Sequence, residues 1–106
     1  VVIHDDIDLP FGTLRFKKGG GDGGHNGLKS IDSSVGKGYI RCRFGVGKPL
    51  HASQVANYVL APFSPTEESL LDDLIVHTRE ACLALLRYDL PRVQSLYSRK
   101  SSHQEG

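Results

Sequence analysis

Residues 17–30, KKGGGDGGHNGLKS, gather six glycines around one aspartate and then set a histidine beside an asparagine. Glycine in a regular element costs roughly 0.5 to 1 kcal/mol relative to alanine. A run this dense therefore indicates a main chain that adopts unusual dihedral angles or that lets a ligand approach closely. The competing interpretation is a flexible surface loop.

Regular elements are expected on both sides of this loop. Apolar and polar residues alternate in TLRFKK and in YIRCRFG, which predicts half-buried strands over residues 13–18 and 39–45. Between them, HNGLKSIDSSVG predicts a short helix that stops at Gly36. Further helices are expected in ASQVANYVL, in a long segment capped by Ser64, and over residues 89–97. Together with the apolar strand at the start, this order predicts a single-domain α/β sandwich.

Composition limits the class of protein. The chain has 106 residues, 39% of them hydrophobic, which is enough for one domain with one core. No apolar run approaches the roughly 18 to 20 residues that span a bilayer, and the acidic start is unlike a signal peptide, so we expect a soluble cytoplasmic protein. Cys42 and Cys82 lack a C-x-x-C spacing and are expected to be buried thiols, with no disulfide and no zinc site. Because the chain has no methionine and opens on an apolar triplet, we interpret it as the C-terminal part of a longer polypeptide.

A local basic block stands out from the net charge of +1. Residues 1–14 carry −3, residues 15–48 carry +6 and residues 49–106 carry −2. If the two predicted strands are neighbours, their outward faces form one basic strip, made of Arg15, Lys17, Arg41 and Arg43. Neither strand contains an acidic residue, so this strip needs an anionic partner or a neighbour outside the chain, unless it is simply a solvated sheet face. A phosphate-bearing partner would satisfy it.

A second candidate site follows the first strand, where HDDIDLP places three aspartates within four residues. The carboxylates repel one another unless they are solvated or paired with a cation or an imidazole. Ligands usually bind at strand ends in α/β sheets, and an aspartate that orients a histidine makes a general base near neutral pH. The alternative is an acidic turn.

The generic glycine motifs do not fit the loop. The G-x-G-x-x-G match lacks an acidic residue about 20 positions on, and Leu28 stands where a P-loop requires glycine before Lys29. What remains is a set of main-chain amides at a helix start, able to hold a phosphate or another electron-rich group.

The combination of HDDIDLPFGTLRFKKGGGDGGHNGLKSI, RCRFGVGKP and NYVLAPFSPTE closely resembles bacterial-type peptidyl-tRNA hydrolase over roughly residues 1–97. The resemblance implies the C-terminal part of one α/β domain with a central mixed sheet, its N-terminal part missing. Beyond it, the polar residues 98–106 are expected to form a disordered tail. The resemblance also implies hydrolysis of the ester between peptide and tRNA by water that a histidine activates, in a monomer without metal or cofactor. The partner implied is peptidyl-tRNA, through its acceptor stem and 3′ end. Because the family's general-base histidine has no counterpart here, we expect this chain alone to be inactive.

The same resemblance assigns residues. Asp5 matches the aspartate that orients the general base. His25 and Asn26 match a pair in the cleft wall, where the first supports the substrate or a neighbouring amide and the second binds the peptide or the terminal ribose. Lys17 and Arg43 match the pair that grips the tRNA 5′ phosphate. Further substrate contacts are expected from Gly23, Gly24, Arg15 and Arg41.

Two other functions remain open. A non-catalytic RNA-binding relative would keep this fold and serve to recruit partners. A plain nucleotide-binding module would bind free mononucleotides in the absence of tRNA.

Overall fold

The central element is a three-stranded sheet in a computed structural model that describes residues 1–100. Its strands are β1 (Val2–Asp6), β2 (Leu14–Lys18) and β3 (Ile40–Gly45), in the spatial order β1-β3-β2. β1 runs parallel to β3, whereas β2 runs antiparallel to it. The expected mixed sheet is therefore confirmed, with β3 in its middle.

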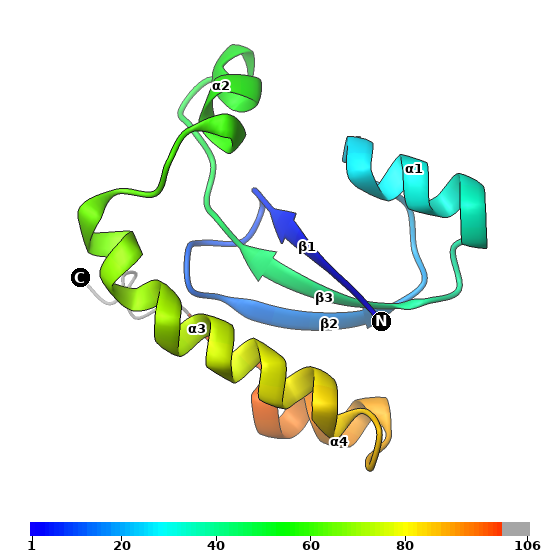
Figure 1. Cartoon of the computed structure of the whole chain (residues 1–106). Coiled ribbons are helices and arrows are strands. Elements are labelled where there is room, and N and C mark those ends of the chain that lie inside the picture. The colour runs from blue at the N-terminus through cyan, green and yellow to red at the C-terminus, as the bar shows by residue number, and fades with distance from the viewer. Residues whose placement is uncertain (101–106) are drawn as a thin grey trace.

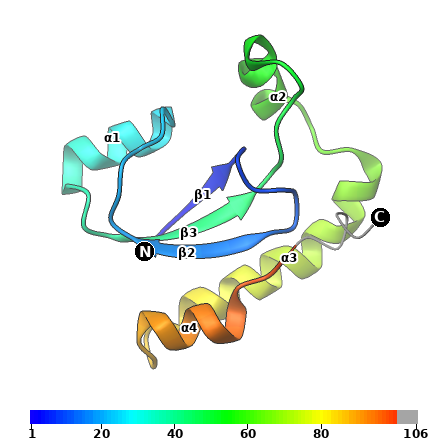
Figure 2. The same ribbon diagram turned by 180° about the vertical axis from the view of Figure 1, so that it is seen from behind.

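Helices cover both faces of the sheet. The structure forms α1 (Asn26–Val35), the 3-10 turn η1 (Ala52–Gln54), α2 (Val55–Leu60), α3 (Pro65–Ala84) and α4 (Leu90–Tyr97). Figures 1 and 2 show α1 and α2 on one side of the sheet and α3 and α4 on the other. The α/β architecture expected from the order of elements is confirmed, and the functional residues discussed below lie on the α1 side.

The helix ends follow the sequence signals. Ser64 caps α3 by accepting a hydrogen bond from the Glu67 amide, and the Glu67 carboxylate accepts one from the Ser64 amide in return. Pro65 occupies the first turn, where its missing N–H costs nothing. Asp89 caps α4 by accepting a single hydrogen bond from the Arg92 amide. These local bonds satisfy N–H groups that a helix start would otherwise leave open.

The core lies between the sheet and the two C-terminal helices. Its buried members are Leu14, Phe16, Cys42, Ala81, Ala84 and Val93. On the α1 side Leu28 is the buried residue of that helix. The apolar layer thus anchors α3 and α4 firmly, whereas α1 contributes a single buried leucine.

The C-terminal tail differs at its start from the disordered segment expected over residues 98–106. Arg99 pairs with Leu14 in an isolated bridge, with backbone N–O distances of 2.8 and 3.0 Å. The remainder of that segment, residues 101–106, lies outside the described residues. Within residues 1–100, no helix has a stretch long and apolar enough to cross a membrane.

We predict that Cys42 makes the fold sensitive to alkaline pH. Burial raises the pKa of the Cys42 thiol from 9.0 to about 12. Between pH 9 and pH 12 the unfolded chain ionises this thiol and the folded one does not, so its contribution to stability is complete below pH 9 and is lost as pH rises.

The Cys42→Ala variant should start about 1 kcal/mol less stable because it loses a buried sulfur. Thermal melts across this pH range should show the gap between wild type and variant closing as pH rises. A gap that stays constant to pH 12 would contradict the assignment.

Candidate active site

The three aspartates at the carboxyl end of β1, Asp5 and Asp6 within the strand and Asp8 just after it, have different surroundings. Asp6 accepts hydrogen bonds from Arg43 Nε at 2.9 Å and from the Asp8 amide at 2.9 Å. Asp8 is exposed, 3.8 Å from Lys48 Nζ. Asp5 is half exposed, and its Oδ1 lies 2.7 Å from His25 Nε2. Asp5 is thus the one of the three whose carboxylate pairs with an imidazole.

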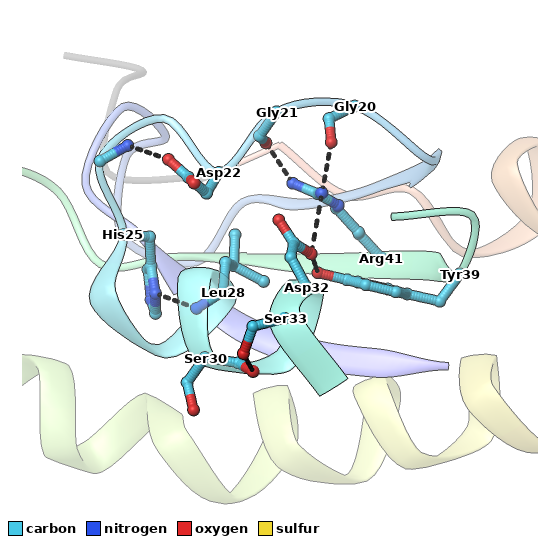
Figure 3. A network of polar contacts seen from close by, with 11 residues as sticks. Gly20, Gly21, Asp22, His25, Leu28, Ser30, Asp32, Ser33, Tyr39 and Arg41 are labelled. Atoms are coloured by element: carbon cyan, nitrogen blue, oxygen red, sulfur yellow. Dashed lines mark hydrogen bonds and ion pairs between the residues drawn. The ribbon is translucent and has the colours of Figure 1, made fainter. Parts of the chain in front are cut away.

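His25 caps α1 through its ring, and this fixes its tautomer. The Leu28 amide donates to His25 Nδ1 at 3.1 Å, as Figure 3 shows. An amide N–H can only donate, so Nδ1 carries a lone pair and the ring proton sits on Nε2. That Nε2–H donates to Asp5 Oδ1. Both ring nitrogens are therefore engaged, one by the helix start and the other by the carboxylate.

Gly27 leaves room for this ring. A β-carbon at Gly27 would lie 2.9 Å from His25 Cε1 and 3.2 Å from Nδ1, closer than such contacts normally come. The imidazole can therefore lie across the first turn of α1 because residue 27 has no side chain. The sequence HNG supplies the capping ring and the space for it in three consecutive residues.

His4 is the second imidazole in the cleft. Its Nδ1 lies 2.8 Å from the Asp5 carbonyl, which can only accept, so His4 carries its proton on Nδ1. Burial lowers the pKa of His4, which keeps the ring neutral at neutral pH. Its Nε2 is buried and has no partner among residues 1–100. The His4 and His25 rings meet edge to face with centroids 5.4 Å apart.

Asp22 holds the glycine loop through two hydrogen bonds, a role that the sequence did not reveal. Asp22 Oδ1 accepts from the Gly24 amide at 2.8 Å, and its carbonyl accepts from the His25 amide at 2.9 Å. The Gly24 amide, expected to face the substrate, is thus already bonded. Gly23 and Gly24 both have positive φ, which explains the glycines there. The D-x-G spacing was the available signal for this turn.

The four basic residues do share one face of the sheet, because Arg15 lies opposite Arg43 and Lys17 opposite Arg41. That face is not the simply solvated one that the sequence left open as the alternative. Arg41 is only 4% exposed, and its guanidinium bonds to the Gly20 and Gly21 carbonyls.

The expected need for a neighbour outside the chain does not hold for two of the four cations, which pair with carboxylates of the chain itself. β1 lies beside β3 and brings Asp6 to Arg43, while α1 brings Asp32 to within 3.8 Å of Arg41. The strand alternation could not show this, because both carboxylates come from other segments. Arg15 bonds to the carbonyls of Leu14 and Arg99, and Lys17 remains exposed.

Except for Arg15, the predicted site residues line one cleft of about 960 Å³ at the carboxyl ends of the parallel strands. Its polar wall contains the two imidazoles, Asp5, Asn26, Lys17 and Arg43. Its opposite wall is apolar and comes from α2, through Val55, Ala56, Val59 and Leu60. Among residues 1–100, no three His, Cys, Asp or Glu side chains are grouped so that they could hold a metal ion.

The chain resembles known proteins along nearly its whole length. The sequence model of the family described as peptidyl-tRNA hydrolase matches residues 1–105. The peptidyl-tRNA hydrolases of Sulfurovum sp. (strain NBC37-1) and Aliarcobacter butzleri (strain RM4018) are 62% and 56% identical to it. These matches cover 95% and 94% of this chain, and 53% and 55% of the two relatives.

Solved structures agree with this. A crystal structure of peptidyl-tRNA hydrolase in complex with N-propanol matches with a TM-score of 0.83 and 33% identity, over 94% of this chain and 51% of that one. A crystal structure of peptidyl-tRNA hydrolase from Acinetobacter baumannii matches with a TM-score of 0.79 and 34% identity, over 91% of this chain and 50% of that one.

Fold and cleft define a mixed-sheet α/β protein with a charged cleft at its strand ends. The chain belongs to the peptidyl-tRNA hydrolase family. It spans about half the length of the curated relatives that it matches.

We predict that Gly27→Ala moves the His25 ring without weakening the fold. The new β-carbon would collide with the imidazole, whereas alanine in a helix gains up to about 1 kcal/mol over glycine. A crystal structure of the variant should show the ring withdrawn from Asp5 Oδ1 or from the Leu28 amide, with a nearly unchanged melting temperature, because the helix gain of alanine offsets the roughly 1 kcal/mol of a lost cap. Gly38→Ala, where a β-carbon meets nothing within 4 Å, is the control. An undisturbed His25 in the Gly27→Ala variant would refute the steric account.

Proposed function

We propose that this chain forms one wall of the active site of an enzyme that hydrolyses the ester between peptide and tRNA in peptidyl-tRNA, and so recycles tRNA. One observation carries the proposal: the Asp5 carboxylate meets the His25 imidazole at 2.7 Å in the strand-end cleft of a chain from this family. The named relatives bear the name of this activity. Since the chain spans about half their length, the activity is proposed for the whole protein.

In this proposal Asp5 supports the histidine that activates water. Its Oδ1 bonds to His25, and no hydrogen bond to its Oδ2 is formed within residues 1–100. Oδ2 is thus available to accept an N–H from another imidazole, which then takes a proton from water. The water oxygen attacks the ester carbonyl, the C–O bond to the ribose breaks, and the ribose oxygen leaves with a proton. The carboxylate stabilises the imidazolium formed during this transfer.

The base itself is proposed to lie outside this chain. His25 cannot accept a proton without giving up the α1 cap, because its lone pair is bonded to the Leu28 amide. His4 has a free lone pair on Nε2, but that atom is buried away from water. We therefore propose that the 106-residue chain alone is inactive and that a histidine from the rest of the protein approaches Asp5.

Substrate binding is proposed for the remaining cleft residues. Asn26 is exposed at the first position of α1 and lines the cleft, where its amide is placed to bind the peptide or the terminal ribose. The apolar wall of α2 offers a surface for apolar parts of the peptide. Lys17 and Arg43 are proposed to grip the tRNA 5′ phosphate. Arg43 bonds to Asp6 only through Nε, which leaves its two terminal nitrogens for an anion.

The proposed substrate indicates the compartment in which the protein acts. Peptidyl-tRNA released by ribosomes is found in the cytoplasm, so we propose that the protein acts there during translation. We further propose that it acts as a monomer.

Asp5→Asn should cut turnover on the order of 10²-fold or more, because it loses the charge that supports the imidazolium at almost unchanged volume. Substrate affinity should change little. Asp6→Asn is the matched control. It weakens a structural ion pair with Arg43, worth about 1 kcal/mol, so its main effect should be a lower melting temperature, with a smaller loss of kcat than in Asp5→Asn.

Steady-state kinetics of the complete protein on peptidyl-tRNA distinguish the two variants. A larger loss of kcat in Asp6→Asn than in Asp5→Asn would show that Asp5 is not the carboxylate that supports catalysis. Tight tRNA binding by the wild type without any turnover would instead support the non-catalytic RNA-binding relative.

Lys17→Ala and Arg43→Ala should weaken binding of full peptidyl-tRNA and reduce its salt dependence by about one phosphate contact each. Hydrolysis of a short 3′ fragment that lacks the 5′ phosphate should be nearly unchanged. Arg79→Ala removes an exposed cation from the opposite side of the sheet and serves as the control for net charge. Equal losses on the full and the short substrate would place these residues in the chemistry and contradict the phosphate clamp.

A further inference from the structure

Arg41 is the most deeply buried charged residue described, although its position in the sequence suggested an outward, RNA-facing side chain. Its two terminal nitrogens bond to the carbonyls of Gly20, at 2.6 Å, and Gly21 (Figure 3). Arg41 lines the cleft, but it is only 4% exposed and both of its terminal nitrogens are bonded to main-chain carbonyls, which leaves little of it for a phosphate. Arg41 therefore acts on the protein itself.

The guanidinium also connects to α1. Asp32, on that helix, places Oδ1 3.8 Å from Arg41, and the Tyr39 hydroxyl donates to the same oxygen at 2.5 Å. The Arg41 guanidinium carbon lies 5.1 Å from the centre of the Tyr39 ring. The hydrogen bond to Asp32 raises the pKa of Tyr39, which keeps its phenol protonated as a donor. We call Arg41, Asp32 and Tyr39 the polar lock.

The polar lock connects three separate segments of the chain: β3, the glycine loop and α1. This matters because α1 buries only Leu28, which contributes about 2 kcal/mol of apolar burial and does not fix a helix in one orientation. The same helix carries His25 at its cap and Asn26 at its first position. The loop that Arg41 holds leads directly into that cap.

We propose that Arg41 is a positioning residue: by fixing the glycine loop and α1 on the central strand, it sets the distance between His25 and Asp5. It does not bind RNA. Its effect on turnover rests on the proposed hydrolase function, whereas its effect on the loop and on α1 does not. Because the Arg41 guanidinium and the Asp32 carboxylate lie 3.8 Å apart and both side chains are buried, loss of either charge leaves the other without compensation.

Kinetics of the complete protein separate positioning from RNA binding. Arg41→Met should lower kcat on the order of 10²-fold, the scale expected when a catalytic group is displaced by about an ångström, with the salt dependence of KM unchanged. Arg41→Lys should recover part of the loss, since a lysine can reach only some of these oxygens. Lys17 is exposed on the neighbouring strand. Lys17→Met should therefore show the opposite pattern, with weaker substrate binding and a smaller dependence of that binding on salt concentration. An Arg41→Met variant with that same pattern would overturn the proposal.

If Arg41→Met does not fold, a milder variant and a measurement that needs no substrate still test the proposal. Tyr39→Phe keeps the ring over Arg41 but removes the hydroxyl that holds Asp32. Amide hydrogen exchange should quicken from Gly20 to Leu28 and stay unchanged in α3. Exchange that is unchanged in the loop would overturn the polar lock. If exchange responds but the wild type never hydrolyses peptidyl-tRNA, the proposed function fails and the positioning role stands.

Discussion

The arrangement around Asp5 in the candidate site depends on one imidazole that is bonded at both nitrogens. His25 accepts from the first turn of α1 and donates to Asp5 at the end of β1, so a helix start and a strand end are joined through a single ring. The donor and acceptor roles are forced, because the Leu28 amide cannot accept and Nε2 must then carry the proton. A ring held in this way orients a carboxylate well and is poorly suited to collect a proton itself.

The sheet order explains how the surrounding charges are arranged. With β3 in the middle, its two arginines face carboxylates from β1 and α1, so both are paired within the chain. Lys17 and the outer part of Arg43 remain for a ligand at the cleft. A cluster of cations in the sequence is therefore a poor measure of how many are available to nucleic acid.

Local patterns predicted most of the fold and part of the site. Strand alternation, the Ser64 capping box and the Gly36 stop concern residues a few positions apart, and the structure confirms the elements they indicated. The burial of Arg41 could not be predicted, because it depends on Asp32 and the glycine loop packing over β3. The distinct surroundings of Asp5 and Asp6 likewise depend on which strand lies beside β1. Roles assigned by resemblance for Asp5, His25 and Asn26 remain predictions.

The most direct test of this account is the protonation of the His25 ring. Nitrogen chemical shifts of the histidine side chains, measured by NMR at neutral pH in wild type and in Asp5→Asn, report which ring nitrogen carries the proton. The account predicts that His25 is protonated on Nε2 with a free lone pair on Nδ1, and that the Nε2 signal changes when Asp5 loses its charge. A ring protonated on Nδ1, or an Nε2 signal that does not respond to Asp5, would contradict it.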